Sequence, residues 1–273
     1  MTTTQQAKAE LLHRLHVPGT PLVLANVWDA ASARLVAATG APAVATASAS
    51  VSWTRGVPDG GGLDLAGALA QTELVVRAVD VPVTADLEDG LAADPAGVGD
   101  TVTALLAIGA VGLNLEDAHH GGAAPLRPVA EAAERVAAAR AAAEAAGIRL
   151  YLNARTDVFL AGAGDLDEAV ERARAYVAAG ASGIFVPGVA DAATITELVK
   201  ALPDVPLNVM AGPGAPTVAE LAALGVARIS LGPGLAKVAY AAVRRAAAEV
   251  YGTGTYGALE GGLEYGELNA LFG

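Results

Sequence analysis

The sequence contains no cysteine, and several other residue types are scarce. Its 273 residues include only 2 tryptophans, 2 methionines and 3 phenylalanines. Without cysteine the chain can form no disulfide, no thiolate metal site and no cysteine nucleophile. Basic residues are also few, because 17 Lys and Arg stand against 29 Asp and Glu, giving a net charge of −12. A chain with this negative net charge repels phosphate backbones and anionic lipids. We therefore expect no nucleic-acid partner and no membrane partner.

Long apolar runs are missing as well. The mean hydropathy of +0.45 is high, but the longest uncharged run, residues 35–54, is interrupted by Gly40, Pro42 and three serines. No transmembrane helix is therefore predicted. The first residues show no basic flank followed by an apolar stretch, so we expect no secretory signal and a cytoplasmic location.

Short apolar segments alternate along the chain with alanine-rich segments of helical period. Eight apolar segments predict β-strands: Leu22–Ala25, Ala43–Thr46, Val81–Ala85, Gly112–Leu115, Leu150–Asn153, Gly183–Val186, Leu207–Met210 and Arg228–Leu231. Apolar residues recur every three or four positions in Pro128–Ala146 and Leu166–Ala179, which predicts helices. Eight such units favour an α/β fold, a (β/α)8 TIM-type barrel over residues 1–250. A doubly wound open sheet is the alternative.

Residues 251–273 lie outside this alternation. They contain seven glycines, but also Leu259, Leu263, Tyr265 and Phe272, which make the segment more apolar than disordered chains usually are. We predict a C-terminal arm that packs on a neighbouring subunit of a homo-oligomer. A solvated tail is the alternative.

Carboxylates follow three successive predicted strands. Asp86 and Glu88 follow the third strand, Glu116 follows the fourth and Asp157 follows the fifth. The C-terminal ends of barrel strands meet at one mouth, where these acids would repel one another unless a cation neutralised them. Oxygen ligands without cysteine suit Mg²⁺, or else Mn²⁺. The sequence therefore predicts a hard divalent cation at the barrel mouth.

Each of these acids could instead cap the helix after its strand. We prefer this interpretation for Asp89, Asp117 and Asp157, and the metal interpretation for Asp86, Glu88 and Glu116.

Other side chains at the predicted mouth suggest an acidic substrate. The Arg155 guanidinium could hold a substrate carboxylate with two hydrogen bonds, or it could only neutralise the acids nearby. His119 and His120 precede two glycines and could donate or accept a proton. None of the three lysines lies at the C-terminal end of a predicted strand, which disfavours Schiff-base chemistry.

Four motifs occur in order at these positions: NVWDAASA from Asn26, TADLEDG from Thr84, GLNLED from Gly112 and NARTD from Asn153. Because of these motifs, the sequence resembles the isocitrate lyase/phosphoenolpyruvate mutase superfamily of Mg²⁺-dependent (β/α)8 enzymes, and the resemblance extends over about residues 22–241. In members of this superfamily a 2-oxo acid or its enolate chelates the metal. The resemblance implies the following roles: Asp86 as the direct metal ligand, Asp59, Glu88 and Glu116 as holders of its water ligands, Arg155 as the carboxylate-binding residue, and Thr46, Ala47 and Ser48 as the turn that grips the substrate carboxylate. It also implies a dimer or tetramer that exchanges C-terminal helices.

The loop after the fourth strand departs from the family pattern. Lyases of the superfamily carry a Lys-Lys-Cys-Gly-His segment there, and the mutases carry a Lys and an Asn, whereas this loop reads EDAHHGGAAPLRP. We therefore predict a Mg²⁺-dependent lyase or decarboxylase that cleaves a C–C bond of a small 2-oxo acid through an enolate, with water, His119 or His120 supplying the proton. The alternatives are a P–C bond enzyme of the phosphoenolpyruvate mutase or phosphonopyruvate hydrolase type, and a 2-oxo acid binding protein without turnover.

Overall fold

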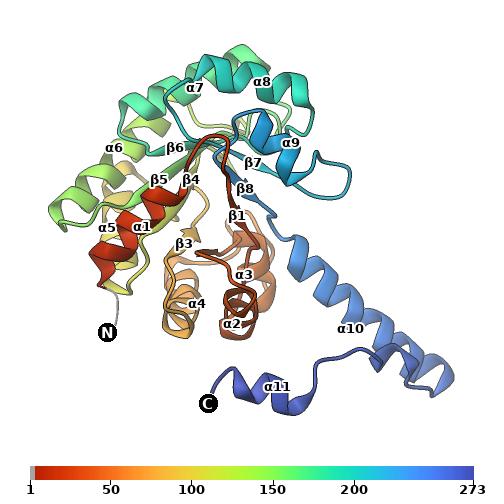
Figure 1. Ribbon diagram of the computed structural model, residues 1–273. Helices are drawn as coiled ribbons and strands as arrows, with labels where there is room; N and C mark the ends of the chain where they lie inside the picture. The colour runs from red at the N-terminus through yellow and green to blue at the C-terminus, as the bar shows by residue number, and fades with distance from the viewer. Residues whose placement is uncertain (1–3) are drawn as a thin grey trace.

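The computed structural model describes residues 4–273, in which eight parallel strands form one curved sheet (Figure 1). The strands are β1 (Leu22–Leu24), β2 (Val44–Ala45), β3 (Val83–Asp86), β4 (Gly112–Glu116), β5 (Tyr151–Arg155), β6 (Gly183–Phe185), β7 (Leu207–Met210) and β8 (Arg228–Ser230). Their order is β1-β8-β7-β6-β5-β4-β3-β2, and a bridge between Val27 and Thr46 nearly closes the gap between β1 and β2. The predicted (β/α)8 barrel is confirmed. The three residues at the start of the predicted 1–250 domain lie outside the described residues.

Helices alternate with the strands and, as far as β8, cover the outside of the barrel. They are α1 (Gln5–Leu15), α2 (Ala30–Ala38), α3 (Ser48–Thr54), α4 (Leu65–Ala78), α5 (Pro95–Ala107), α6 (Val129–Ala145), α7 (Leu166–Ala178), α8 (Ala192–Ala201), α9 (Val218–Ala223), α10 (Gly234–Thr253) and α11 (Tyr265–Ala270), with a 3₁₀ turn η1 (Gly257–Leu259). On β4, Leu113 and Leu115 belong to the core beneath α5 and α6, together with Val102 and Val136. The alternate residues of β4 face the barrel interior, because side chains alternate along a strand.

The residues that cap the helices differ from those expected. Asp94 caps α5 by accepting one backbone N–H group and Asp165 caps α7 by accepting two, whereas α6 follows Pro128 without a side-chain cap. The prediction that Asp89, Asp117 and Asp157 cap these helices is wrong. A capping side chain must stand directly before the first turn, and these three acids lie several residues earlier, in the loops.

The C-terminal part of the chain leaves the barrel along α10, of which only Ala236 is buried (Figure 1). At its far end the Glu249 carboxylate accepts hydrogen bonds from Gly257 N and Ala258 N, which reverses the chain direction. Arg34 of α2 donates to the carbonyl of Leu271 near the C-terminus. The expected division at residue 250 falls inside α10, and the division of the chain into two domains stays a prediction.

Within residues 4–273, no helix is both long enough and apolar enough to cross a membrane.

Candidate active site

A cavity of about 230 Å³ opens at the C-terminal ends of the strands, where barrel enzymes carry their active sites. Its lining consists of Asn26, Ala47, Ser48, Ala49, Asp59, Asp86, Asn114, Arg155, Leu160, Phe185, Met210, Ser230, Gly232 and Pro233. Five predicted site residues are therefore brought together here: Ala47, Ser48, Asp59, Asp86 and Arg155. Thr46, Glu88, Glu116, His119 and His120 do not line it. A wider depression of about 580 Å³ beside His13 and Arg149 contains none of the predicted site residues.

Asp86 ends β3 and is held by the turn that follows β2. Its backbone N–H donates to Oγ1 of Thr46 over 2.9 Å, and its Oδ2 accepts the backbone N–H of Ser48 over 3.2 Å. Its Oδ1 is buried and has no hydrogen-bond partner among the described residues. Burial raises the pKa of Asp86, an effect that the charge of Arg155 opposes. A buried oxygen with a free lone pair is a fitting ligand for a hard cation.

Glu88 lies two residues beyond Asp86, is 3% exposed and has a φ of 52°. This left-handed conformation is strained for a residue with a side chain. Its Oε2 accepts the backbone N–H of Gly61 over 2.6 Å. Burial raises the pKa of Glu88, and the negative charge of Asp59 adds to the effect. A cation near Asp59 and Glu88 would relieve this repulsion.

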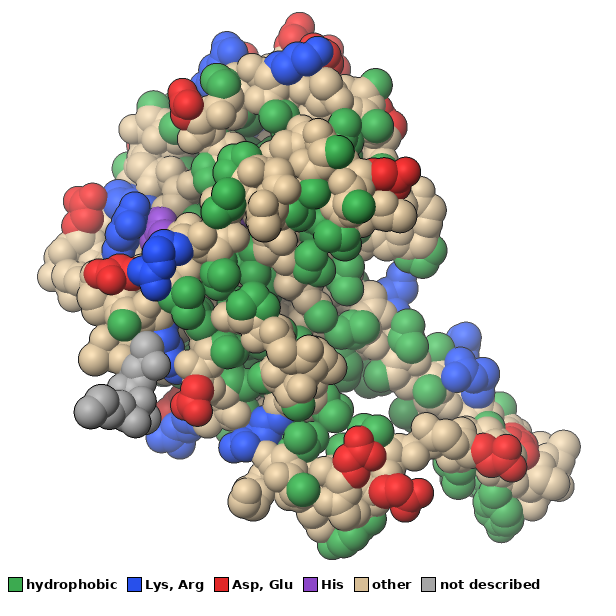
Figure 2. Space-filling view, viewed as in Figure 1, with side chains coloured by type: hydrophobic (Ala, Val, Ile, Leu, Met, Phe, Trp, Pro, Cys, Tyr) green, Lys and Arg blue, Asp and Glu red, His purple; other side chains and the backbone are tan. Residues whose placement is uncertain are grey.

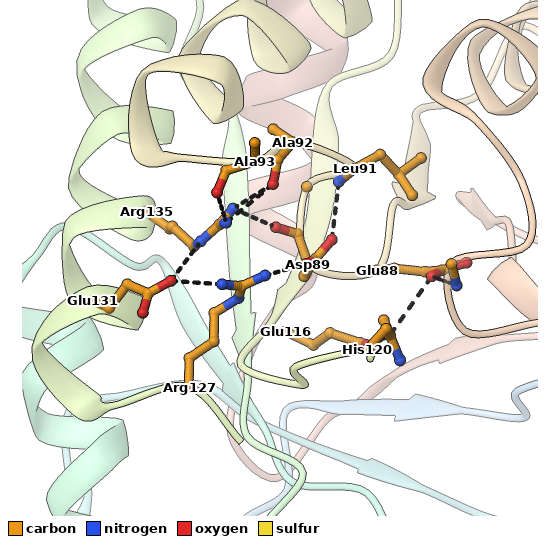
Figure 3. A network of polar contacts seen from close by, with 12 residues as sticks. Glu88, Asp89, Leu91, Ala92, Ala93, Glu116, His120, Arg127, Glu131 and Arg135 are labelled. Carbon is orange, nitrogen blue, oxygen red and sulfur yellow. Dashed lines mark hydrogen bonds and ion pairs between the residues drawn. The ribbon is translucent and has the colours of Figure 1, made fainter. Parts of the chain in front are cut away.

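Two arginines fix the loop that carries Glu88 (Figure 3). Arg127 pairs with Asp89 over 2.7 Å and also with Glu131. Arg135 of α6 is 1% exposed and donates to the carbonyls of Asp89, Ala92 and Ala93. Asp89 therefore anchors the β3–α5 loop against α6. These contacts offset the strain at Glu88, because they hold the backbone on the far side of that residue.

Glu116 ends β4 and joins Arg155 to His120. Its Oε2 lies 2.9 Å from Nη1 of Arg155, and its Oε1 lies 3.0 Å from Nε2 of His120. The same His120 nitrogen lies 3.6 Å from Oε2 of Glu88 (Figure 3). Burial raises the pKa of Glu116 to about 7, although Arg155 opposes the rise. The hydrogen bond to Glu116 raises the pKa of His120. Glu116 and His120 share a hydrogen bond and therefore titrate as a coupled pair.

His119 does not join this group. Its ring packs against Gly122, where an added Cβ atom would lie 2.3 Å from Nδ1 of His119. The two ends of the loop are paired, since Ala118 bridges Leu126. Only His120 of the two predicted histidines therefore contacts the carboxylates of the mouth.

Arg155 ends β5, and its guanidinium contacts two protein carboxylates. Nη2 donates to Oδ2 of Asp157 over 2.8 Å, Nε pairs with the other Asp157 oxygen, and Nη1 pairs with Glu116. Burial disfavours its charge, but Glu116 and Asp157 more than compensate and raise the pKa of Arg155 above its usual value. Arg155 thus neutralises nearby acids, one of the two roles expected from the sequence. Its grip on a substrate carboxylate stays a prediction.

A cation at this mouth would need ligands besides the protein side chains. Across residues 4–273 no three His, Asp or Glu side chains converge into a group that could hold a metal by itself. The free Oδ1 of Asp86 fits one direct bond to a metal. Mg²⁺ commonly keeps several water ligands when protein carboxylates bind it.

Sequence reasoning missed several residues of the cavity. Asn26 opens the first motif; its Oδ1 accepts the N–H of Leu231 and its Nδ2 donates to the Thr46 carbonyl, which joins the ends of β8, β1 and β2. Asn114 and Ser230 contribute polar groups from β4 and β8. Polar residues inside otherwise apolar strands were the available signal, because such residues must face the barrel interior or a cavity.

An eight-stranded parallel barrel with acidic side chains and a cavity at its C-terminal mouth defines the enzyme scaffold of the (β/α)8 class. The chain belongs to the phosphoenolpyruvate phosphomutase family, whose model matches residues 12–251. It is thereby a member of the phosphoenolpyruvate mutase/isocitrate lyase superfamily, as the motifs predicted.

Similar proteins carry several activities. The chain is 36% identical to an uncharacterised protein of Mycobacterium tuberculosis over 81% of each chain. It is 31% identical to the 2-methylisocitrate lyase of Escherichia coli K12, covering 69% of this chain and 68% of that one. A Burkholderia cenocepacia protein provisionally called a phosphonomutase has 48% identity and a TM-score of 0.84, covering 87% of this chain and 98% of that one. The structure of phosphonopyruvate hydrolase with oxalate and Mg²⁺ has 26% identity and a TM-score of 0.87, and the match covers 99% of this chain and 95% of that one.

Proposed function

We propose that this protein is a Mg²⁺-dependent lyase or decarboxylase that cleaves a C–C bond of a small 2-oxo acid through an enolate. The observation that carries the proposal is the Asp86 carboxylate, with its buried and unpartnered Oδ1, in a cavity that it shares with Ser48 and Arg155. Relatives that are lyases or that bind oxalate with Mg²⁺ support the same chemistry.

The acids of the mouth have two different parts in this proposal. Asp86 would hold the ion directly, and Asp59, Glu88 and Glu116 would hold its water molecules. When bound, the metal supplies positive charge that stabilises the enolate oxygen as the C–C bond breaks. The chain itself keeps the Asp86 carboxylate in place through the Thr46 hydroxyl and the Ser48 N–H.

Arg155 would bind the substrate, and His120 would supply the proton that completes the reaction. The Arg155 guanidinium borders the cavity and is cationic, so it attracts a substrate carboxylate even while it pairs with Glu116 and Asp157. His120 bonds to Glu116 and can pass a proton to the enolate by way of water. Decarboxylation demands least of a loop without a thiol, since CO₂ leaves without a proton donor.

The experiment titrates the purified protein with oxalate at saturating Mg²⁺, then incubates it with a panel of 2-oxo acids, including oxaloacetate and phosphonopyruvate. We expect oxalate binding that requires Mg²⁺, together with CO₂ or a shorter 2-oxo acid as product. Phosphate released from phosphonopyruvate would favour the P–C alternative. Oxalate binding without any product would favour a binding protein. No metal-dependent binding would overturn the proposal.

A further inference from the structure

Buried asparagines on adjacent strands lie at the floor of the cavity and directly below it. Asn114 of β4 pairs in register with Asp86 of β3 on one side and Asn153 of β5 on the other. Asn114 borders the cavity and is 3% exposed, whereas Asn153 is wholly buried below the lining. The amide of Asn114 therefore lies beside the Asp86 carboxylate, at the same level of the barrel.

The orientation of the Asn114 amide is determined by its neighbours. Its Oδ1 accepts from Nδ2 of Asn153 over 2.9 Å and from Nη2 of Arg228 over 3.2 Å. A guanidinium can only donate hydrogen bonds, so the atom of Asn114 that faces Arg228 must be its oxygen. The amide nitrogen must then point away from Arg228. No acceptor for it is found among residues 4–273, so it is the polar atom left to face the cavity.

Arg228 is an unusual residue for such a place. It begins β8, is 0% exposed, and forms no ion pair with a carboxylate among residues 4–273. Asn114 accepts the one side-chain hydrogen bond found for its guanidinium, and Nε and Nη1 have no partner. A buried cation costs stability. In return, the buried Arg228 guanidinium provides a fixed hydrogen-bond donor to the Asn114 side chain.

We propose that Asn114 is a substrate-binding residue whose Nδ2 donates to a carboxylate or enolate oxygen of the ligand, and that Arg228 is a positioning residue that fixes this amide. The inference rests on the proposed function for the class of ligand, a small oxyanion of oxalate type. The proposal adds a hydrogen-bond donor at the cavity floor. This donor favours a negatively charged oxygen, whereas the adjacent Asp86 carboxylate favours a cation. A ligand with an oxygen at this point would be preferred over one with a methyl group or an ammonium there, because either of those would leave the donor unpaired.

The first test measures oxalate affinity by calorimetry at saturating Mg²⁺, and Mg²⁺ affinity alone. Asn114→Ala should weaken oxalate binding by about ten- to a hundredfold, the range for one hydrogen bond to a charged group, and leave Mg²⁺ affinity within about twofold. Asn114→Asp should weaken it further, because it presents a second carboxylate to an anion. Leu113→Val, on the opposite face of β4, is the matched control and should bind as the wild type does.

The second test separates positioning from charge by a double-mutant cycle. Arg228→Met should weaken oxalate binding roughly tenfold in the wild-type background and by less than about twofold in the Asn114→Ala background. Arg228→Lys keeps the charge but not the reach to Asn114, so it should bind as weakly as Arg228→Met does. It also provides the comparison if Arg228→Met does not fold.

The outcomes separate the two proposals. Wild-type protein that binds no oxalate with Mg²⁺ overturns the proposed function and this inference together. Normal oxalate binding by Asn114→Ala overturns the inference alone. Equal losses from Arg228→Met in both backgrounds, or wild-type affinity in Arg228→Lys, show that Arg228 does not act through Asn114.

Discussion

The Nε2 atom of His120 lies 3.0 Å from Oε1 of Glu116. This hydrogen bond ties the loop after β4 to the carboxylates at the barrel mouth. Because the loop has no thiol and no lysine, the histidine is the loop side chain best suited to move a proton there.

Replacing His120 should therefore affect turnover more than substrate affinity. For His120→Asn we expect kcat to fall about a hundredfold, the lower range for loss of a general acid, while the affinity for oxalate changes little. His119→Asn is the matched control, since His119 packs on Gly122 and, unlike His120, forms no ion pair with a carboxylate among the described residues. Steady-state kinetics on the substrate found in the panel provide the measurement. Equal effects of the two variants would assign the proton to water instead.

The mouth carboxylates should make the metal-free protein less stable as the pH rises. Burial raises the pKa of Glu116 from a usual 4.5 to about 7. The folded state then binds its proton more tightly than the unfolded state, so the stabilisation is complete below about pH 4.5 and is lost as the pH rises through about 7. The shift corresponds to roughly 3 kcal/mol. Glu88 and Asp86 shift in the same direction.

Urea unfolding in chelator between pH 4.5 and 8 tests this expectation, with Glu116→Gln as the comparison. The stability difference between the two proteins should change with pH in the stated direction. Added Mg²⁺ should reduce the slope, because a cation favours the ionised carboxylates. A difference that does not vary with pH would mean that Glu116 titrates normally.

Replacing Asp86, the proposed direct metal ligand, should abolish Mg²⁺ binding without unfolding the barrel. Asp86→Asn keeps the shape of the side chain and can still meet the Ser48 N–H through its oxygen. We expect no measurable Mg²⁺-dependent oxalate binding and an unchanged circular dichroism spectrum. Glu73→Gln, an exposed acid on α4, controls for the loss of one negative charge. Normal binding by Asp86→Asn would place the ion elsewhere.

Arg155→Lys should reduce the affinity for carboxylate ligands. Lysine keeps the charge but loses the two-pronged geometry, and the loss of one charged hydrogen bond is worth about ten- to a hundredfold in affinity. Calorimetry with oxalate measures the effect. Asp157→Asn tests whether the arginine must first leave Asp157. If it must, freeing the guanidinium should strengthen oxalate binding. Unchanged affinity in Arg155→Lys would reopen the substrate class.

The arm should be an oligomer contact. On α10, which leads into the arm, Val238 and Val243 are 67% and 66% exposed, and Tyr251 at the start of the arm is 90% exposed. Figure 2 shows apolar side chains along this extension. So many apolar side chains along one extension favour burial against a second copy of the chain. Light scattering should show at least a dimer, and deletion of residues 251–273 should lower the melting temperature. A monomeric mass with unchanged stability after deletion would contradict the prediction.

The strands could be predicted closely because their sequence signal is local. Apolar runs between glycines and prolines placed β7 at Leu207–Met210, as observed. Strand ends were less certain: β5 was expected to end at Asn153 but continues to Arg155. Charged residues usually mark the end of an apolar strand, yet here Arg155 pairs with Glu116 across the sheet, so the strand extends to the mouth.

The contacts within the site could be predicted only in part. Strand-end position was enough to bring Asp86 and Arg155 to one cavity, and the family resemblance added Ser48. It could not reveal that Arg127 holds Asp89, because the two residues come from different loops and their pairing depends on the tertiary fold. Nor could it reveal that Arg228, which looks like an ordinary first residue of a strand, donates to Asn114 beside the cavity.

The pairing of Arg127 with Asp89 limits how this loop could be re-engineered. A designer who wished to install the missing thiol would graft a loop from a lyase relative in place of residues 119–125. The splice points would be the bridged pair Ala118 and Leu126. A longer graft that removed Arg127 would break its ion pair with Asp89 and leave Arg135 alone to hold the loop that carries Glu88. The grafted segment must therefore be short. Its C-terminal boundary is set by Arg127, a residue that takes no part in the proposed chemistry.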